Sequence, residues 1–330
     1  MLVSELSEHL APAAEMVVSC SLGDLRVQDW ADSVSVGSEQ FLLDDLGTSV
    51  LAKFLHVPST YIKRCPPEFR AQTLNYWADQ QAETDVNVFV DARGELVSVQ
   101  SPDVVTVPTD RVGHMVARVF APDDQVSVYR DFDSLHIDVV SKIHSVDVPN
   151  PQSLPFRPLV GDVTHGGVRI LTRPHESTNP VVVSYLERLV CLNGMTSSQK
   201  LGKISIKGLT VEDVLEEMEA AARTVLGGLE RSLDLYAATA GIPVPGSLQA
   251  FAHQLAVEYG LKRQILDEVM LIVNQLPESA TVYDVLQAFT QVAGMLDWPT
   301  RMRMQSLGGD LALETERMIK RCSSCERLLP

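Results

Sequence analysis

The spacing of hydrophobic residues changes along the chain and divides it into regions of different expected structure. Residues 1–45 show no sustained period and mix strand and turn signals. Over residues 46–84, Leu51, Phe54 and Leu55 recur at intervals of three to four, the period of an amphipathic helix, and prolines interrupt the pattern. We therefore expect an N-terminal segment followed by a small helical subdomain.

From residue 85 the hydrophobic residues follow a period of two. Val86, Val88 and Val90 alternate with polar residues up to a turn at Gly94, which predicts a β-hairpin. Further strands are expected at residues 126–130, 135–140, 167–172 and 181–192, with a helix at 110–120. Residues 85–209 are thus predicted to form a β-rich core, a mainly antiparallel sheet with helical insertions.

The helical period returns at residue 210 and continues to the C-terminus. Thr210 and Asp213 have the spacing of a capping box. Hydrophobic residues from Val211 to Leu233 then keep one face apolar over roughly seven turns, which predicts one long helix. Shorter helices are expected at 248–259, 262–276, 282–297 and 310–321. The predicted fold class is α+β, with residues 210–330 as a helical C-terminal region.

Charge is distributed unevenly, because a basic segment lies within an acidic protein. The chain has a net charge of -16, yet residues 151–211 contain seven basic and three acidic residues. No acidic residue lies between Arg188 and Val211. Such a strip attracts a phosphate backbone or an acidic partner, although lysines of an ordinary solvated loop are the alternative. The predicted nucleic-acid-binding residues are Arg169, Arg173, Arg188, Lys200, Lys203 and Lys207.

Histidines and carboxylates in the middle of the chain suggest a second kind of site. His136 and Asp138 share one face of a predicted strand, and His144 and His165 lie near it in the sequence. These groups have the chemistry of a metal or acid-base site, but no metalloprotease, Walker, Rossmann or serine-nucleophile motif accompanies them. A polar strand face directed to solvent is the alternative. No catalytic residue is assigned.

Cysteine usage indicates a reducing compartment and one candidate metal site. The five cysteines are odd in number and scattered, unlike a disulfide framework. Cys322 and Cys325 have the spacing of half a zinc site, so zinc would need ligands from another subunit or from Cys20, Cys65 or a histidine. Redox chemistry or unpaired tail cysteines are the alternatives. Zinc held between subunits would make the protein a homo-oligomer.

The N-terminus lacks the positive start and apolar run of an export signal, and no stretch approaches the roughly 20 apolar residues that span a bilayer. We therefore expect a cytoplasmic protein without a membrane partner.

Three stretches resemble a known family. GGVRILTR at residues 166–173, LERLVCLNGM at 186–195 and GELVSVQSPDVVTVP at 94–108 are similar to a family of uncharacterised phage- and plasmid-carried proteins, and so is the C-terminal helix with Phe289 and Trp298. The resemblance covers about residues 46–300. It departs at Leu192, where the family usually has threonine beside the asparagine. It implies a mobile-element origin and no particular mechanism.

Three functions follow as hypotheses. The first is a non-enzymatic protein of a mobile element that associates with single- or double-stranded nucleic acid in recombination or replication. For single-strand binding, the basic segment offers only Phe156 and Tyr185 as stacking aromatics. The second is a metal-dependent enzyme that uses His136, Asp138, His144 and His165. The third is an acidic decoy or regulator that binds a host protein.

Overall fold

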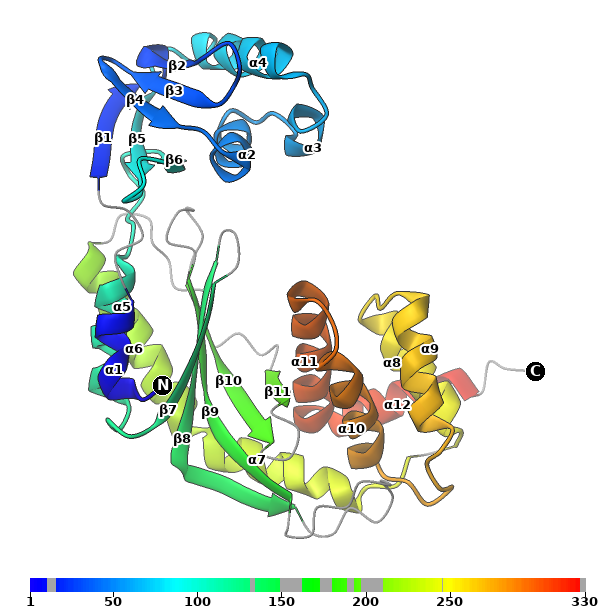
Figure 1. Ribbon diagram of the computed structural model, residues 1–330. Helices are drawn as coiled ribbons and strands as arrows, with labels where there is room; N and C mark the ends of the chain where they lie inside the picture. The colour runs from blue at the N-terminus through cyan, green and yellow to red at the C-terminus, as the bar shows by residue number, and fades with distance from the viewer. Residues whose placement is uncertain are drawn as a thin grey trace.

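The computed structural model describes residues 1–10, 16–130, 134–148, 162–172, 180–188, 193–196, 210–244 and 246–326. The predicted α+β class is confirmed, with antiparallel sheets in the N-terminal and middle parts and helices in the C-terminal region. Figure 1 shows two parts, which we call the N-lobe (residues 16–100) and the body (the remaining described residues). The body holds a five-stranded sheet between two groups of helices.

The N-lobe contains two small sheets and three helices around one core. One sheet contains β1 (Met16–Ser21), β5 (Asp85–Val90) and β6 (Leu96–Gln100). The other contains β2 (Leu25–Val27), β3 (Ser33–Val36) and β4 (Glu39–Leu42). Its helices are α2 (Asp45–Phe54), α3 (Ser59–Ile62) and α4 (Pro67–Asp79), as the period over residues 46–84 predicted.

The predicted hairpin, β5–β6, lies in the N-lobe because β5 also pairs with β1. Leu25, Leu51, Leu74 and Val88, which come from four different elements, are buried in the same cluster. Residues 16–45, residues 46–84 and the start of the region expected to form the β-rich core therefore share one hydrophobic core.

The large sheet of the body has the order β11-β10-β9-β8-β7, and all neighbouring strands are antiparallel. Its strands are β7 (Gln125–Arg130), β8 (Leu135–Val148), β9 (Asp162–Thr172), β10 (Val181–Arg188) and β11 (Asn193–Thr196). In the register of β8 and β9, Asp138 lies opposite Arg169. A register shift between Val140 and Ser145 then bends the β8–β9 strand pair.

One face of the large sheet is apolar and is covered by α1 (Val3–His9), α5 (Thr109–Val119) and α6 (Val211–Gly227). Ile137, Val139, Ile170 and Val182 point from three strands into this core. The apolar residues that alternate along these strands thus form the sheet face that the helices cover.

The predicted long helix is wrong in one respect, because it is divided at Gly228 into α6 and α7 (Leu229–Ala238). Its capping box is confirmed, since the Asp213 backbone N–H donates to Thr210 Oγ1 at 3.2 Å and the Thr210 N–H donates to Asp213 Oδ2 at 2.8 Å. At the break, the Gly228 N–H donates to the Val225 carbonyl at 3.0 Å, a tighter turn than the α-helix makes. Two consecutive glycines favour such an interruption, because glycine has a low helix propensity.

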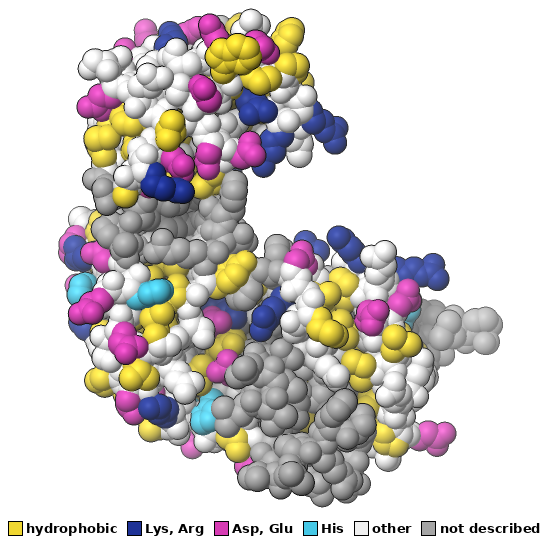
Figure 2. Space-filling view, viewed as in Figure 1, with side chains coloured by type: hydrophobic (Ala, Val, Ile, Leu, Met, Phe, Trp, Pro, Cys, Tyr) yellow, Lys and Arg dark blue, Asp and Glu magenta, His cyan; other side chains and the backbone are white. Residues whose placement is uncertain are grey.

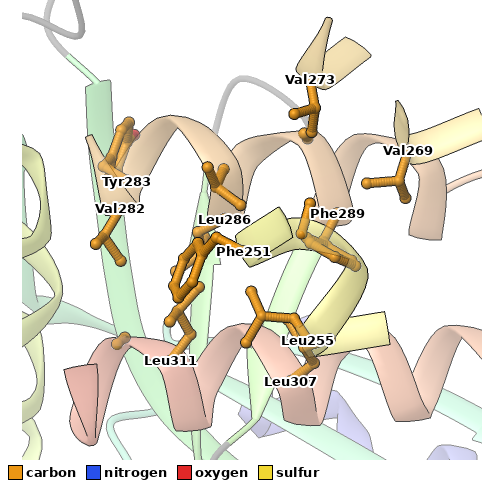
Figure 3. Close-up of a cluster of buried hydrophobic side chains, with 14 of the residues drawn as sticks. Phe251, Leu255, Val269, Val273, Val282, Tyr283, Leu286, Phe289, Leu307 and Leu311 are labelled. Atoms are coloured by element: carbon orange, nitrogen blue, oxygen red, sulfur yellow. The ribbon is translucent and has the colours of Figure 1, made fainter. Parts of the chain in front are cut away.

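The C-terminal helices form a third core, shown in Figure 3, in which Phe251, Leu255, Phe289, Leu307 and Leu311 pack together. The helices are α8 (Leu248–Glu258), α9 (Arg263–Val273), α10 (Val282–Ala293), α11 (Trp298–Leu313) and α12 (Thr315–Glu326). Among the described helices, none is both long and apolar enough to cross a membrane.

The helix predicted at 310–321 is wrong, because two helices meet at Glu314. α11 lies between the sheet and α10 in Figure 1, and Gln305 and Asp310 are buried along with its apolar residues. A helix that buries polar residues as well as apolar ones has no clear amphipathic stripe, which is why periodicity did not locate it.

Candidate functional site

Most of the predicted cationic strip lies outside the described residues. Arg173, Lys200, Lys203 and Lys207 belong to segments that the structure does not describe, and Arg188 is described only as the backbone end of β10. Arg169 is the single member of the set with a described side chain. It lies in β9, on the sheet face opposite the apolar core.

Arg169 is buried, so the expectation that it faces a phosphate backbone has to be corrected. Its side chain is 2% exposed. Its Nε and Nη2 donate to Asp138 Oδ1 and Oδ2 at 2.5 and 2.6 Å, a bidentate ion pair across β8 and β9. Its Nη1 donates to Gln305 Oε1 of α11 at 2.8 Å. The guanidinium therefore binds groups of its own chain, under α11.

Two further ionisable groups of β10 adjoin this ion pair. Arg169 Cζ lies 4.8 Å from the centre of the Tyr185 ring, and the Tyr185 hydroxyl donates to Glu187 Oε1 at 3.4 Å. We call Asp138, Arg169, Tyr185, Glu187 and Gln305 the polar cluster.

The surroundings raise the pKa of three members of the polar cluster, so each of them favours its protonated form. Burial raises the pKa of Tyr185 well above its ordinary value. Burial, and then the Asp138 carboxylate, raise the pKa of Glu187. Burial opposes the charge of Arg169, but the Asp138 carboxylate outweighs it and raises the pKa of the guanidinium. The arginine thus stays charged and the tyrosine stays protonated. Because Arg169 also donates to Gln305, the Asp138–Arg169 ion pair joins α11 to the sheet.

The histidines expected to form a metal site have separate partners. The His136 ring contacts Ser134 Oγ through Nε2 at 3.1 Å and lies edge-on to Tyr129. His144 Nδ1 contacts Ser141 Oγ at 2.9 Å, and His165 lies opposite Ser145 in the β8–β9 register. Within the described ranges, no three His, Cys, Asp or Glu residues are placed to hold a metal ion.

The alternative interpretation of these residues as a solvent-facing strand is wrong, since both His136 and Asp138 are buried. The face is polar because it holds the polar cluster, not because it meets water.

The C-x-x-C pair lies near the end of α12. Only the backbone of Cys322 and Cys325 is described there, so zinc at these residues stays a prediction. The described free thiols belong to the half-buried Cys20 and Cys65 of the N-lobe. Burial raises the pKa of the Cys20 thiol, with Asp24 and Asp85 adding to the effect, which makes it a poor nucleophile.

Exposed cations also gather outside the basic segment of residues 151–211. Figure 2 shows a hollow between the N-lobe and the C-terminal helices, with Lys and Arg side chains on both of its sides. The exposed cations of the elements that border it are Lys53, Lys63 and Arg64 in the N-lobe, and Lys262, Arg263 and Arg303 at the starts of α9 and α11. We call these six residues the cationic rim. Their separation in sequence, by about 200 positions, hides the grouping until the chain is folded.

No protein-family model matches the chain, and comparison with curated proteins and with solved structures finds no match either. Inferences about function therefore rest on the chemistry of the side chains.

Proposed function

We propose that this chain is a nucleic-acid-associated protein of a mobile element, and that the cationic rim meets the phosphate backbone at the hollow. The observation that supports this most directly is the gathering of Lys and Arg side chains on both sides of the hollow in Figure 2. The resemblance to phage- and plasmid-carried proteins supports the mobile-element part.

The charge balance favours a local site over a general coating. With a net charge of -16, most of the surface repels a polyanion. Residues 53–78, which carry the N-lobe part of the rim, contain four basic residues and one acidic residue. A nucleic acid is therefore attracted to the rim and repelled elsewhere, and its affinity should fall steeply as salt is added.

A charge-matched pair of variants tests the proposal. Arg64→Gln/Arg263→Gln removes one cation from each side of the hollow. Arg111→Gln/Arg118→Gln removes two cations that already bind Glu212 and Glu219 across α5 and α6, on the far side of the sheet. Binding of labelled single- and double-stranded DNA is measured by fluorescence anisotropy over a series of salt concentrations.

The rim variant should bind more weakly and lose up to about two released counterions from its salt dependence, and the control should change neither. Equal effects of the two variants would show that the rim is not the binding surface. A wild-type protein without affinity for either DNA at low salt would refute the proposal as a whole.

The basic segment supplies a second set of cations to the same proposal. Neutralising Lys200, Lys203 and Lys207 together should reduce the salt dependence by up to about three counterions. If only the rim variant changes binding, the segment is instead a docking surface for an acidic partner, for example the Glu212 to Glu219 cluster of a second copy.

A further inference from the structure

Exposed aromatic side chains are concentrated on the N-lobe. Of the six Phe, Tyr and Trp side chains that are exposed among the described residues, five belong to it and only Tyr129 belongs to the body. The five are Trp30, Tyr61, Phe69, Tyr76 and Trp77. Large aromatic rings in water are unfavourable, so such a concentration indicates a binding surface.

Helix α4 presents three of these rings and explains why they are exposed. Ala71, Leu74 and Ala78 form its buried stripe and pack into the N-lobe core. Phe69 and Tyr76 lie seven residues apart, on the opposite side of the helix, and are 62% and 58% exposed. Two turns of helix separate them by roughly 10 Å along its axis.

The flank of this exposed side carries a further aromatic ring and a cation. The Trp77 ring stands edge-on to Tyr76, with ring centres 5.5 Å apart. Arg70 precedes Trp77 by seven residues, so the two share one side of the helix. We call Phe69, Arg70, Tyr76 and Trp77 the α4 face.

Cations and polar residues accompany the rings, which distinguishes this surface from a purely apolar one. Lys63 and Arg64 are exposed just before α4, and Gln72 and Gln80 are exposed on α4 itself. The acidic Asp79 binds Arg26 at 2.7 Å. Figure 2 shows hydrophobic side chains on the α4 side of the N-lobe, next to Lys and Arg side chains that lead to the hollow.

We infer that the α4 face binds single-stranded nucleic acid by stacking its bases, while Lys63 and Arg64 bind the phosphates. Aromatic rings beside cations fit unpaired bases, because every base has a π-face and every linkage a negative charge. A duplex fits less well, since its bases already stack on one another. This inference rests on the proposed function and adds a strand preference to it.

The experiment compares two variants that each truncate two exposed side chains. Phe69→Ala/Tyr76→Ala removes rings of the α4 face. The control, Ile143→Ala/Leu271→Ala, removes side chains that are 85% and 60% exposed in the body. The probes are a labelled oligothymidine of about 16 nucleotides, the upper end of single-strand site sizes, and a duplex of the same length.

The α4 variant should bind the oligothymidine about tenfold or more weakly than wild type, because each stacked base contributes about one such factor. Its duplex affinity and its salt dependence should stay unchanged, because no cation is removed. The control should bind both probes like wild type. Circular dichroism should show both variants folded, since all four side chains are exposed.

The possible failures can be told apart. If wild type binds DNA with a salt dependence but the α4 variant matches the control, the stacking inference is wrong and the proposed function stands. If wild type binds neither probe at low salt, both are wrong. If wild type is a dimer in sedimentation and the α4 variant a monomer, the rings are a contact between two copies and the inference is overturned.

Discussion

Removing the cation of the polar cluster should be among the most destabilising single changes in the protein. Arg169→Met takes the positive charge away but leaves the Asp138 carboxylate, whose side chain is only 9% exposed, without its bidentate partner. It also removes the donor to Gln305 of α11. A charge left alone in a buried position costs about 3–5 kcal/mol. Most of that cost comes from the unpaired carboxylate, not from lost packing.

A double variant separates these two contributions. In Arg169→Met/Asp138→Leu both charges are gone, so the buried site contains apolar groups of similar size. Replacing a whole buried pair is often neutral or even stabilising. We therefore expect the double variant to recover most of the stability that Arg169→Met loses. Arg111→Gln provides a surface comparison, because its partner Glu212 is exposed and such pairs contribute about 0–1 kcal/mol.

Urea unfolding followed by circular dichroism gives the free energy of unfolding for each variant. The single variant Asp138→Leu completes a double-mutant cycle with Arg169→Met, the double variant and wild type. A loss below about 1 kcal/mol for Arg169→Met would refute the reasoning, because it would mean that water reaches Asp138. A double variant as unstable as the single one would show that packing, not the unpaired charge, sets the cost.

Three other changes test separate features. Gly167→Ala should lower the free energy of unfolding in urea by about 1–3 kcal/mol, because its Cβ would collide with the Val139 carbonyl oxygen. Gly227→Ala has open space around the new Cβ and should raise it by about 0.5–1 kcal/mol. Equal effects of the two variants would contradict this difference. Glu187→Gln should stabilise the protein at pH 7 more than at pH 4. The raised pKa means that folded protein binds the Glu187 proton more tightly than unfolded protein does, so the contribution of Glu187 to stability falls as pH rises from 4.5 through the raised pKa. A stability difference between variant and wild type that does not change with pH would speak against it. If Cys322 and Cys325 hold zinc between subunits, elemental analysis should find about half a zinc ion per chain, and changing both to serine should abolish the dimer; a metal-free protein with unchanged mass in solution would remove the idea.

Local patterns predicted the secondary structure well wherever hydrophobic residues recur with a regular period or a cap has its usual spacing. The hairpin over residues 86–99, the strand that starts at Leu135 and the Thr210 capping box were all found, because each depends on residues close in sequence. α11 was missed because both sides of it are buried, so it has no polar stripe to mark its period.

The polar cluster could not be predicted because it depends on strand register. Asp138 and Arg169 are 31 positions apart, and only the antiparallel pairing of β8 with β9 places them opposite each other. The charge of Arg169 was assigned to a surface strip because net charge by segment does not distinguish buried from exposed residues. An arginine within an alternating apolar strand was the available signal, since such a position is buried only if a carboxylate pairs with it.

α11 connects the polar cluster to the cationic rim. Arg303 belongs to the rim, and Gln305, two residues later on the same helix, accepts the hydrogen bond from Arg169. Arg303 and Gln305 lie on the same helix, so the bond from Arg169 to Gln305 helps to fix the position of Arg303. Arg169 thus contributes to the proposed binding surface by orienting α11, although its own charge is buried and cannot touch a phosphate. For this reason Arg169→Met should weaken DNA binding only as far as it loosens α11, and the double variant that restores stability should restore binding with it.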